Sequence, residues 1–551
     1  GVNLPVLKDL LAGGGDLLLT CDTGITAHEP LAYAVAQGVD VLITDHHDLP
    51  ETLPPALAAV NPKMLPADHP LRELPGVGVA YQLAALLYER AGRPEEAERL
   101  LDLVAIGIVA DVAVLTGDTR YLLQRGLEVL RRADRLGLRV MMELTGLVPE
   151  RLTEEHVAYL LAPRLNSLGR LDDATAGVEF LLTADLTQAR TLATTMEGLN
   201  ARRKLLCDQV AQAAIAQIEQ DPTLLDYAAL VLSHPAWPPG VVGVVAGHLA
   251  ERYHRPTILI ATPEGEMGRG SARSVPGCDI HAAIAAQRDL LVRFGGHPMA
   301  AGLTIAPERI PDFRRALSRT VREMCGDEPG RMAETLPIAA YLPLADLSLS
   351  LAESLERLAP FGPGHPPPTL ATRGLRLRTH TPIGRTGEHL RLLVEDEAGT
   401  VQKVVWWQWN GAPLPTGRFD LAYTVRAGDY RGRREVQVEW VDARPAADEP
   451  PVSVRSSLAV NDWRPADDPH RTLERLRAAG DDLAVWAEGE GRSAVAGRHR
   501  YDLEPARTLV IWTAPPGPDE LRDVLRRVSP AEVHLFGQLP VGGDDPKPFL
   551  E

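Results

Sequence analysis

The sequence has little of what marks a membrane protein or a zinc-stabilised protein. No apolar run approaches the ~20 residues that a helix needs to cross a bilayer. The 4 cysteines, Cys21, Cys207, Cys278 and Cys325, are widely spaced and form no CxxC pair. This spacing argues against a structural zinc site and fits a reducing compartment. We therefore expect a cytoplasmic protein with no membrane partner.

Lysine is also scarce, and arginine carries nearly all of the positive charge. The lysines are Lys8, Lys63, Lys204, Lys403 and Lys547, within a total of 57 basic and 74 acidic residues. The formal net charge of −17 argues against a protein that coats a polyanion over its whole surface. An acidic average is still compatible with a local basic groove.

The length of 551 residues predicts about three or four domains, because single cores stop growing beyond ~250–300 residues. Near the start, residues 16–21 and 39–44 are continuous apolar runs, and residues 27–38 between them have a helical pattern that ends at Gly38. This alternation predicts two buried parallel strands with a helix crossover. Ligands of such sheets bind beyond the carboxyl ends of the strands.

Later segments predict a second α/β lobe and two further domains. Residues 95–115 and 190–220 have the pattern of long helices, and the first would bury Asp111. Strands and helices alternate again from about 226 to 325, and five short β-like runs follow "PFGPGHPPP" (360–368). Five strands in about 75 residues favour a small barrel of the oligonucleotide-binding (OB) type. The predicted domains are 1–189, 190–225 (connecting helix), 226–335, 336–370 (linker), 371–447 (barrel) and 455–551 (a small α/β domain).

Several potential metal ligands follow apolar elements that should meet at one cleft. They are Asp22, Asp45, His46, His47 and Asp111. Carboxylate oxygens and imidazoles without thiolate suit Mn²⁺ or Mg²⁺. A pair of such ions activates water and stabilises a leaving oxygen in phosphodiester hydrolysis. Each residue alone is equally compatible with a helix-capping aspartate or a solvated histidine.

Five motifs carry a family resemblance. "TCDTGI", "TDHHDLP", "GIVADV", "APRLNSLGRL" and "FGGHPMAAG" occur in the order seen in the DHH/DHHA1 phosphoesterase superfamily. Over about residues 1–450 the chain resembles RecJ-type single-strand-specific 5′→3′ exonucleases. The resemblance implies that Asp22, His46, His47 and Asp111 are metal-binding and catalytic. Asp45 would orient the histidines.

The same resemblance implies a substrate-binding set. It comprises Arg164, Asn166, Arg170, Arg269, Ser271, Arg273, Gly296 and His297. Arginine suits a bidentate grip on phosphate, and glycine-rich turns let backbone amides surround an anion. The alternatives are surface arginines paired with Asp172 or Asp173, and a simple turn at 295–302.

The predicted barrel offers a track for a single strand. Arg376, Arg378, Tyr430, Arg431 and Arg433 combine guanidinium groups with one aromatic platform. Such a combination binds single strands without sequence preference. We interpret about half of the barrel's tryptophans as core residues and none as a base-stacking residue.

One family motif does not appear. RecJ-like proteins have a DxDxxG motif before the segment that matches "TCDTGI", and here only 21 residues precede Asp22. Two Mn²⁺ carry four positive charges, whereas Asp22 and Asp111 supply two negative ones. We therefore expect roughly 100 further N-terminal residues in the native gene, with two metals in the complete protein. The 551-residue chain should hold one metal firmly and be nearly inactive.

The sequence thus predicts a monomeric exonuclease for single-stranded DNA in repair and recombination. Its partners would be single-stranded DNA and a single-strand-binding protein or a helicase. One alternative is a small-substrate DHH enzyme, such as an oligoribonuclease or pyrophosphatase, but a barrel would be superfluous for it. The other is a non-catalytic single-strand-binding scaffold, but the intact metal-binding pattern argues against it.

Overall fold

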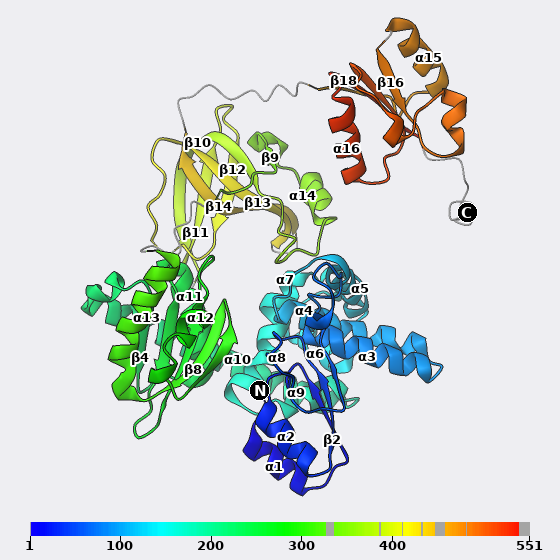
Figure 1. Cartoon of the computed structure of the whole chain (residues 1–551). Helices are drawn as coiled ribbons and strands as arrows, with labels where there is room; N and C mark the ends of the chain where they lie inside the picture. Colours follow the sequence, from blue (N-terminus) through cyan, green and yellow to red (C-terminus); the bar gives the residue numbers. More distant parts are fainter. Residues whose placement is uncertain are drawn as a thin grey trace. The chain divides into compact units, whose positions relative to one another are not determined.

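The computed structural model describes residues 2–326, 335–384, 387–409, 411–430, 433–446, 458–480 and 482–538. The chain divides into two compact units, residues 1–446 and 447–551. The predicted fold class is confirmed, because α/β lobes, a connecting helix, a barrel and a small α/β unit are all present (Figure 1). No helix among the described residues is long and apolar enough to span a membrane.

The first sheet is small and parallel, with strand order β1-β2-β3. Its elements are α1 (Leu4–Ala12), β1 (Leu17–Cys21), α2 (His28–Ala36), β2 (Asp40–Thr44) and β3 (Ala58–Val60). Leu7 of α1 and Leu31 of α2 are buried with Val41 and Ile43 of β2. The apolar runs of the sequence therefore form strands, and β2 buries its side chains as predicted. The prediction of a buried strand is wrong for β1, because β1 is at the edge of this sheet and Leu17 and Leu19 are exposed.

A helical region completes the first lobe. Its helices are α3 (Gly76–Arg90), α4 (Leu101–Ala110), α5 (Gly117–Arg132), α6 (Leu136–Thr145), α7 (Glu154–His156), α8 (Ala162–Leu171) and α9 (Thr175–Leu182). The expected single helix over 95–115 is wrong in two respects. Residues Pro94–Leu100 are 3₁₀-helical, and α4 ends at Ala110 because Val112 takes a left-handed backbone (φ 54°). Asp111 therefore lies at the helix end and is exposed rather than buried.

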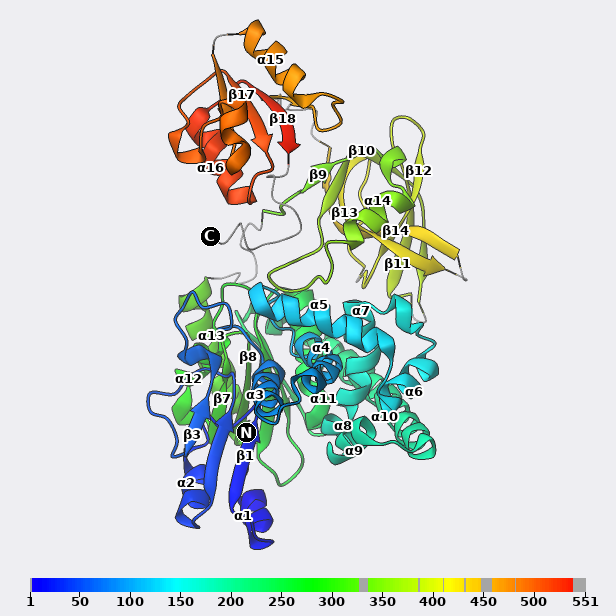
Figure 2. The same cartoon turned by 90° about the vertical axis from the view of Figure 1, so that its right-hand side faces the viewer.

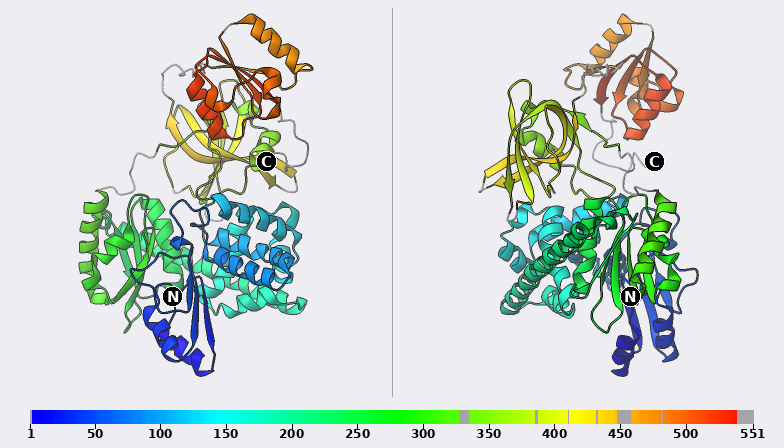
Figure 3. Two further views of the ribbon diagram at one scale, coloured as in Figure 1. Left: turned by 45° about the vertical axis from the view of Figure 1, so that its right-hand side comes forward. Right: turned by 90° about the vertical axis from the view of Figure 1, so that its left-hand side faces the viewer.

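The connecting helix α10 (Leu186–Gln220) is 35 residues long. Asp185 caps it by accepting hydrogen bonds from the N–H groups of Thr187 (2.6 Å) and Gln188 (3.0 Å). Its first half packs against α6, α8 and α9, and it also packs against α11 of the second lobe (Figure 3, right). The helix thus contributes to the cores of both lobes.

The second lobe contains a mixed five-stranded sheet of order β4-β5-β6-β8-β7. Its elements are β4 (Leu230–His234), α11 (Pro239–Tyr253), β5 (Thr257–Ala261), β6 (Gly268–Arg273), α12 (Ile280–Ala285), β7 (Arg293–His297), β8 (Ala300–Ile305) and α13 (Ile310–Cys325). Only β4 and β5 pair in parallel.

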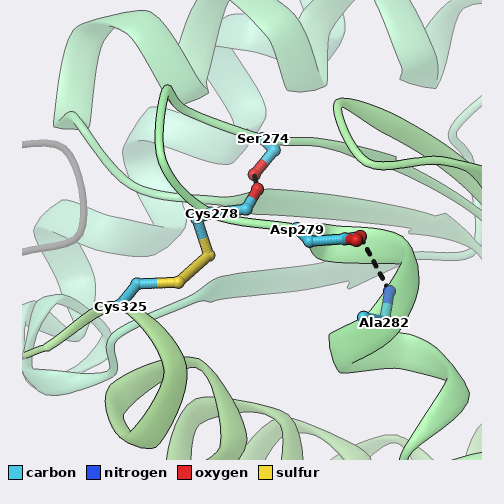
Figure 4. Close-up of a disulfide and its surroundings, with 5 residues drawn as sticks. All are labelled: Ser274, Cys278, Asp279, Ala282 and Cys325. Carbon is cyan, nitrogen blue, oxygen red and sulfur yellow. Dashed lines mark hydrogen bonds between the residues drawn. A yellow bond between two sulfur atoms is a disulfide. The ribbon is translucent and has the colours of Figure 1, made fainter. Parts of the chain in front are cut away.

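A disulfide joins two parts of this lobe (Figure 4). Cys278 lies in the loop before α12, and Cys325 is the last residue of α13, with 5.7 Å between their Cα atoms. In the same loop the Ser274 hydroxyl donates to the Cys278 carbonyl (2.5 Å), and the Asp279 carboxylate caps α12 at Ala282 N–H (2.9 Å). The spacing of the cysteines in the sequence gave no indication of this pairing.

The barrel sheet begins before α14 (Leu349–Glu356) and continues after it, and α14 packs against β13 (Figure 2). Its strands are β9 (Ala340–Tyr341), β10 (Leu370–Ile383), β11 (His389–Glu395), β12 (Val401–Trp406), β13 (Arg418–Tyr430) and β14 (Arg433–Pro445). β10 pairs with β11 as well as with β13, so β10–β14 close into a five-stranded barrel of the OB type. Trp406, Trp409 and Trp440 pack against its core, whereas Trp407 is exposed.

The second unit is a parallel four-stranded sheet of order β15-β18-β17-β16. Its elements are β15 (Ala459–Asp462), α15 (Pro469–Ala479), β16 (Leu483–Trp486), β17 (Thr508–Thr513), α16 (Pro518–Val528) and β18 (Glu532–Gln538). Val510 and Phe536 are buried on one side, and Leu509 and Val533 on the other.

Candidate active site

The ends of β1 and β2 bring the first candidate residues together. The two strands pair in register up to Cys21 and Thr44, and the Asp22 N–H donates to the Thr44 carbonyl (2.9 Å). Asp22 has a left-handed backbone (φ 59°), which aspartate tolerates better than most residues. Both strands therefore deliver their next residues at the same edge of the sheet.

His46 lies between two carboxylates at this edge. Its Nε2 is 3.0 Å from Asp22 Oδ1 and 3.9 Å from Asp111 Oδ2. The first residue of α3, Gly76, touches the Asp22 side chain so closely that a Cβ at position 76 would overlap the carboxylate. Glycine at this position lets the helix reach Asp22.

Asp45 is buried and holds the two histidines in place. Its carboxylate accepts hydrogen bonds from the backbone N–H groups of Ile25 (2.9 Å), His46 (2.8 Å) and His47 (3.3 Å). It also lies 2.6 Å from His47 Nδ1. Burial raises the pKa of Asp45, but these hydrogen bonds outweigh burial and lower the pKa to about 2. The bond to Asp45 in turn raises the pKa of His47.

Asp111 reaches the same place from the end of α4. Desolvation raises the pKa of its carboxyl group, and the negative charge of Asp22 acts in the same direction, while His46 lowers it. A bound cation would relieve this repulsion between neighbouring carboxylates.

The donor set fits a hard divalent cation. The ligand atoms of Asp22, His46 and His47 lie within 4.8 Å of one another, and Asp111 lies next to His46. Oxygen and imidazole donors without a thiolate suit Mn²⁺ or Mg²⁺. These residues supply two negative charges, which matches one firmly bound divalent ion.

The second lobe adds His297 to this cluster. The imidazole of His297, at the end of β7, stacks on that of His47 with 5.1 Å between ring centroids and 14° between ring planes. Its Nδ1 is 3.4 Å from the Asp48 carboxylate. Gly296, before it, has a backbone φ of 148°. The site is therefore built from both lobes.

A group of arginines lies where α8, α10 and β6 approach one another. Desolvation, followed by the positive charge of Arg203, lowers the pKa of Arg170. Desolvation, followed by the charge of Arg170, lowers the pKa of Arg273, whose Nη1 lies 3.2 Å from Ser271 Oγ. A Cβ at Gly243 of α11 would come within 2.7 Å of Ser271 Oγ and 3.2 Å of Arg273 Nη2. Within the described part of the chain these three arginines form no salt bridge, although Arg203 donates to Asn200 Oδ1 (3.0 Å) and Arg273 to the Ala272 carbonyl (2.8 Å). Guanidinium groups around a hydroxyl, without a carboxylate partner, favour an anion.

Arg203 was not among the residues predicted from the sequence. It lies within "NARRKLL" on α10, and nothing in that helical pattern distinguishes it from a surface arginine.

Some predicted substrate residues have other surroundings. Arg164 is buried, pairs with Glu197 of α10 and donates to the Leu160 carbonyl (2.7 Å), so it fastens α8 to α10. Arg378 makes a bidentate pair with Glu395. Asn166, Arg269 and Arg376 are exposed. Arg431 and the side chains of Tyr430 and Arg433 lie outside the described residues.

Comparison with known proteins agrees with this division of the chain. Residues 4–108 match the model of the DHH family, N-terminal domain, residues 223–323 match the DHHA1 domain, and residues 338–442 match the RecJ OB domain. The single-stranded-DNA-specific exonuclease RecJ of Dickeya dadantii (strain 3937) is 33% identical over 80% of this chain and 79% of its own length.

The chain belongs to the RecJ family. The RecJ of Bacillus subtilis (strain 168) is 34% identical over 80% of this chain, and the match spans 56% of that relative's length. A crystal structure of RecJ from Thermus thermophilus in complex with Mn²⁺ superposes with a TM-score of 0.67. It covers 98% of this chain and 76% of that chain at 27% identity. The DHH match includes Asp22, His46 and His47, and the DHHA1 match includes Ser271, Arg273 and His297.

Proposed function

We propose that this chain, together with the further N-terminal residues expected from the sequence, hydrolyses phosphodiester bonds of single-stranded DNA from a 5′ end, in DNA repair and recombination. The observation that carries the proposal is the position of His46 between Asp22 and Asp111, with His47 covered by His297 of the other lobe. Membership of the RecJ family supports the same reaction, because relatives that match over most of this chain are named single-stranded-DNA-specific exonucleases.

We propose that Asp22, His46, His47 and Asp111 hold Mn²⁺ or Mg²⁺. When bound, such an ion lowers the pKa of a water molecule and stabilises the leaving oxygen of a phosphodiester. Asp45 fixes the ring of His47 through its 2.6 Å contact with Nδ1. The His297 ring covers one face of His47 and limits the room for water and for a second strand there.

Arg170, Arg203, Ser271 and Arg273 form the proposed phosphate pocket. Desolvation lowers the pKa of Arg170 and of Arg273, the charge of Arg203 acts in the same direction on Arg170, and that of Arg170 does so on Arg273, so a phosphate between these guanidinium groups would relieve their repulsion. The pocket and the metal centre are connected through the second lobe, since β6 carries Arg273 and β7 carries His297 of the same sheet. A terminal phosphate held here would place an end of the strand near the metal centre.

The barrel supplies the proposed strand track, with Arg376, Tyr430, Arg431 and Arg433 as candidate contacts. We further propose that the domain limits are 1–189, 190–225, 226–335, 336–370, 371–447 and 455–551. The chain would act as a cytoplasmic monomer, with a single-strand-binding protein or a helicase as a further partner.

The test compares Mn²⁺-dependent digestion of three substrates by the protein with its further N-terminal residues: a 5′-labelled single strand, the corresponding duplex and a dinucleotide. The proposal requires release of nucleotides from the single strand and little from the duplex. Preference for the dinucleotide would support a small-substrate enzyme instead. Binding of the single strand without any cleavage would support a non-catalytic scaffold.

A further inference from the structure

A cavity of about 470 Å³ lies beside the end of α4. Its lining is mostly apolar and comes from the end of α4, the segment after α7 and the connector between α14 and β10 (residues 357–369). The apolar and aromatic lining residues include Ile108, Val109, Val112, Tyr159, Phe361 and Pro363. Ala110 lines it as well and directly precedes Asp111 of the metal centre. The volume lies within the ~300–1,000 Å³ typical of pockets for small ligands.

Tyr159 gives this cavity an aromatic face. Its side chain is 72% exposed although it lines the cavity, so its ring is available to a ligand. It belongs to a π-helical segment, Val157–Leu161, between α7 and α8. Such segments are rare and occur frequently at functional sites. Asn166, on the following helix, also lines the cavity and offers an amide that can both donate and accept hydrogen bonds.

The charges around the cavity disfavour a phosphate. Glu154 and Glu155 line it, against one guanidinium, that of Arg426. Arg426 pairs with Glu155 at 2.6 Å, and the Glu154 carboxylate accepts a hydrogen bond from Phe361 N–H (3.1 Å). The net charge of these three side chains is negative, so the cavity repels an anion. The flat, neutral ring of a nucleobase meets an aromatic face instead, and its N–H groups meet hydrogen-bond acceptors.

The cavity also lies on the way from the barrel to the metal centre. Arg426 belongs to β13 of the barrel, and the residue after Ala110 is Asp111. The connector is fastened at this place, because Leu115 N–H donates to the Pro363 carbonyl (2.6 Å) and Arg120 donates to the Leu358 carbonyl (2.7 Å). A strand that contacts both the barrel and the metal centre would pass the opening.

We propose that this cavity receives one nucleobase of the single strand, stacked on Tyr159, while the phosphates on either side stay outside. The inference rests on the proposed function and adds a binding site for a base to it. Stacking does not depend on base identity, so the site would grip any sequence. It would also fix the position of the strand relative to the metal centre.

The experiment is an abasic scan with the full chain. A short, 5′-phosphorylated, 3′-fluorescent strand carries one abasic residue, which is moved by one position at a time. Affinity is measured by fluorescence anisotropy in EDTA, so that no cleavage occurs. The proteins are the wild type, Tyr159→Ala, Tyr159→Phe and, as a matched control in the second unit, Tyr501→Ala, which removes a tyrosine that is 70% exposed.

Loss of one stacked base should raise the Kd about tenfold at a single position of the abasic residue and much less at the others. Tyr159→Ala should raise the Kd of the unmodified strand by a similar factor and abolish the extra loss at that position. Tyr159→Phe and Tyr501→Ala should behave as wild type. A flat scan, or wild-type affinity in Tyr159→Ala, would overturn the proposal.

A separate digestion of the unmodified strand with Mn²⁺ distinguishes failure of the base pocket from failure of the proposed function. Digestion together with a flat scan would refute the base pocket alone and leave the cavity to another occupant. If the wild type neither binds nor digests the strand, both the base pocket and the proposed function are refuted.

Discussion

Asp45→Asn is the sharpest test of how the metal centre is organised, because it alters no proposed ligand. The Asp45 carboxylate is 1% exposed and takes three backbone N–H groups and one imidazole nitrogen. Asparagine has nearly the same shape but replaces one acceptor oxygen with an NH₂ donor. Whichever way the amide turns, at least one buried N–H then faces another donor.

The magnitude follows from these contacts. A buried donor without its acceptor costs about 1–3 kcal/mol, and the lost charge also weakens the contact with His47 Nδ1. Removing the group that orients a ligating histidine typically lowers metal affinity about 10- to 100-fold. We therefore expect the Kd for Mn²⁺ to rise by about 10- to 100-fold, which corresponds to about 1.4–2.7 kcal/mol.

Isothermal titration of Mn²⁺ into the purified full chain measures this change, and circular dichroism establishes that the variant is folded. Asp48→Asn is the matched control, because Asp48 lies in the same loop but its side chain is 68% exposed. Its affinity should stay within about threefold of wild type. A folded Asp45→Asn protein that binds Mn²⁺ as tightly as wild type would refute the role given to Asp45.

Four further predictions concern other parts of the chain. In the complete protein, Asp22→Ala and Asp111→Ala should each lower single-strand digestion to less than a tenth of wild type and leave binding to the strand in a gel-shift assay unchanged; digestion above a tenth of wild type in either variant would contradict the ligand assignment. Arg273→Ala should slow digestion of 5′-phosphorylated strands more than of 5′-hydroxyl strands, whereas equal slowing would indicate general strand binding. Deletion of residues 371–447 should weaken single-strand affinity and flatten the slope of log K against log salt by ~0.7 per lost phosphate contact; an unchanged slope would argue against the barrel as the strand track. Cys278→Ser should lower thermal stability only without reductant, because closing a loop of 47 residues is worth about 4 kcal/mol; equal melting temperatures of the oxidised proteins would show that the disulfide does not form.

Local chain order explains why part of the site was predictable. Asp22 and His46 each follow an apolar run, and parallel strands with a short helix between them must end at the same edge of a sheet. The barrel strands were predictable for a similar reason, because alternating apolar residues in five successive runs specify strands, and β10–β11, β11–β12 and β13–β14 pair as neighbours in sequence.

Contacts between distant segments explain what the sequence did not reveal. Whether Arg164 faces a substrate or Glu197 depends on how α8 packs on α10. The apolar pattern continues past Ala110, so the end of α4 shows only in the left-handed backbone at Val112. The stack of His297 on His47 joins residues from two different sheets, and a single sequence carries no measure of that distance.

The contact between Gly76 and Asp22 changes how variants of this chain should be judged. An alanine in place of a helical glycine is ordinarily harmless, and it often raises helix stability by about 1 kcal/mol. At position 76 the added methyl group would displace the Asp22 carboxylate, although the two residues lie in different elements and neither sequence pattern connects them. A search for stabilising variants guided by helix propensity would select this exchange and displace a proposed ligand of the metal centre. In a catalogue of natural variants, Gly76→Ala belongs with losses of Asp22 rather than with neutral surface changes.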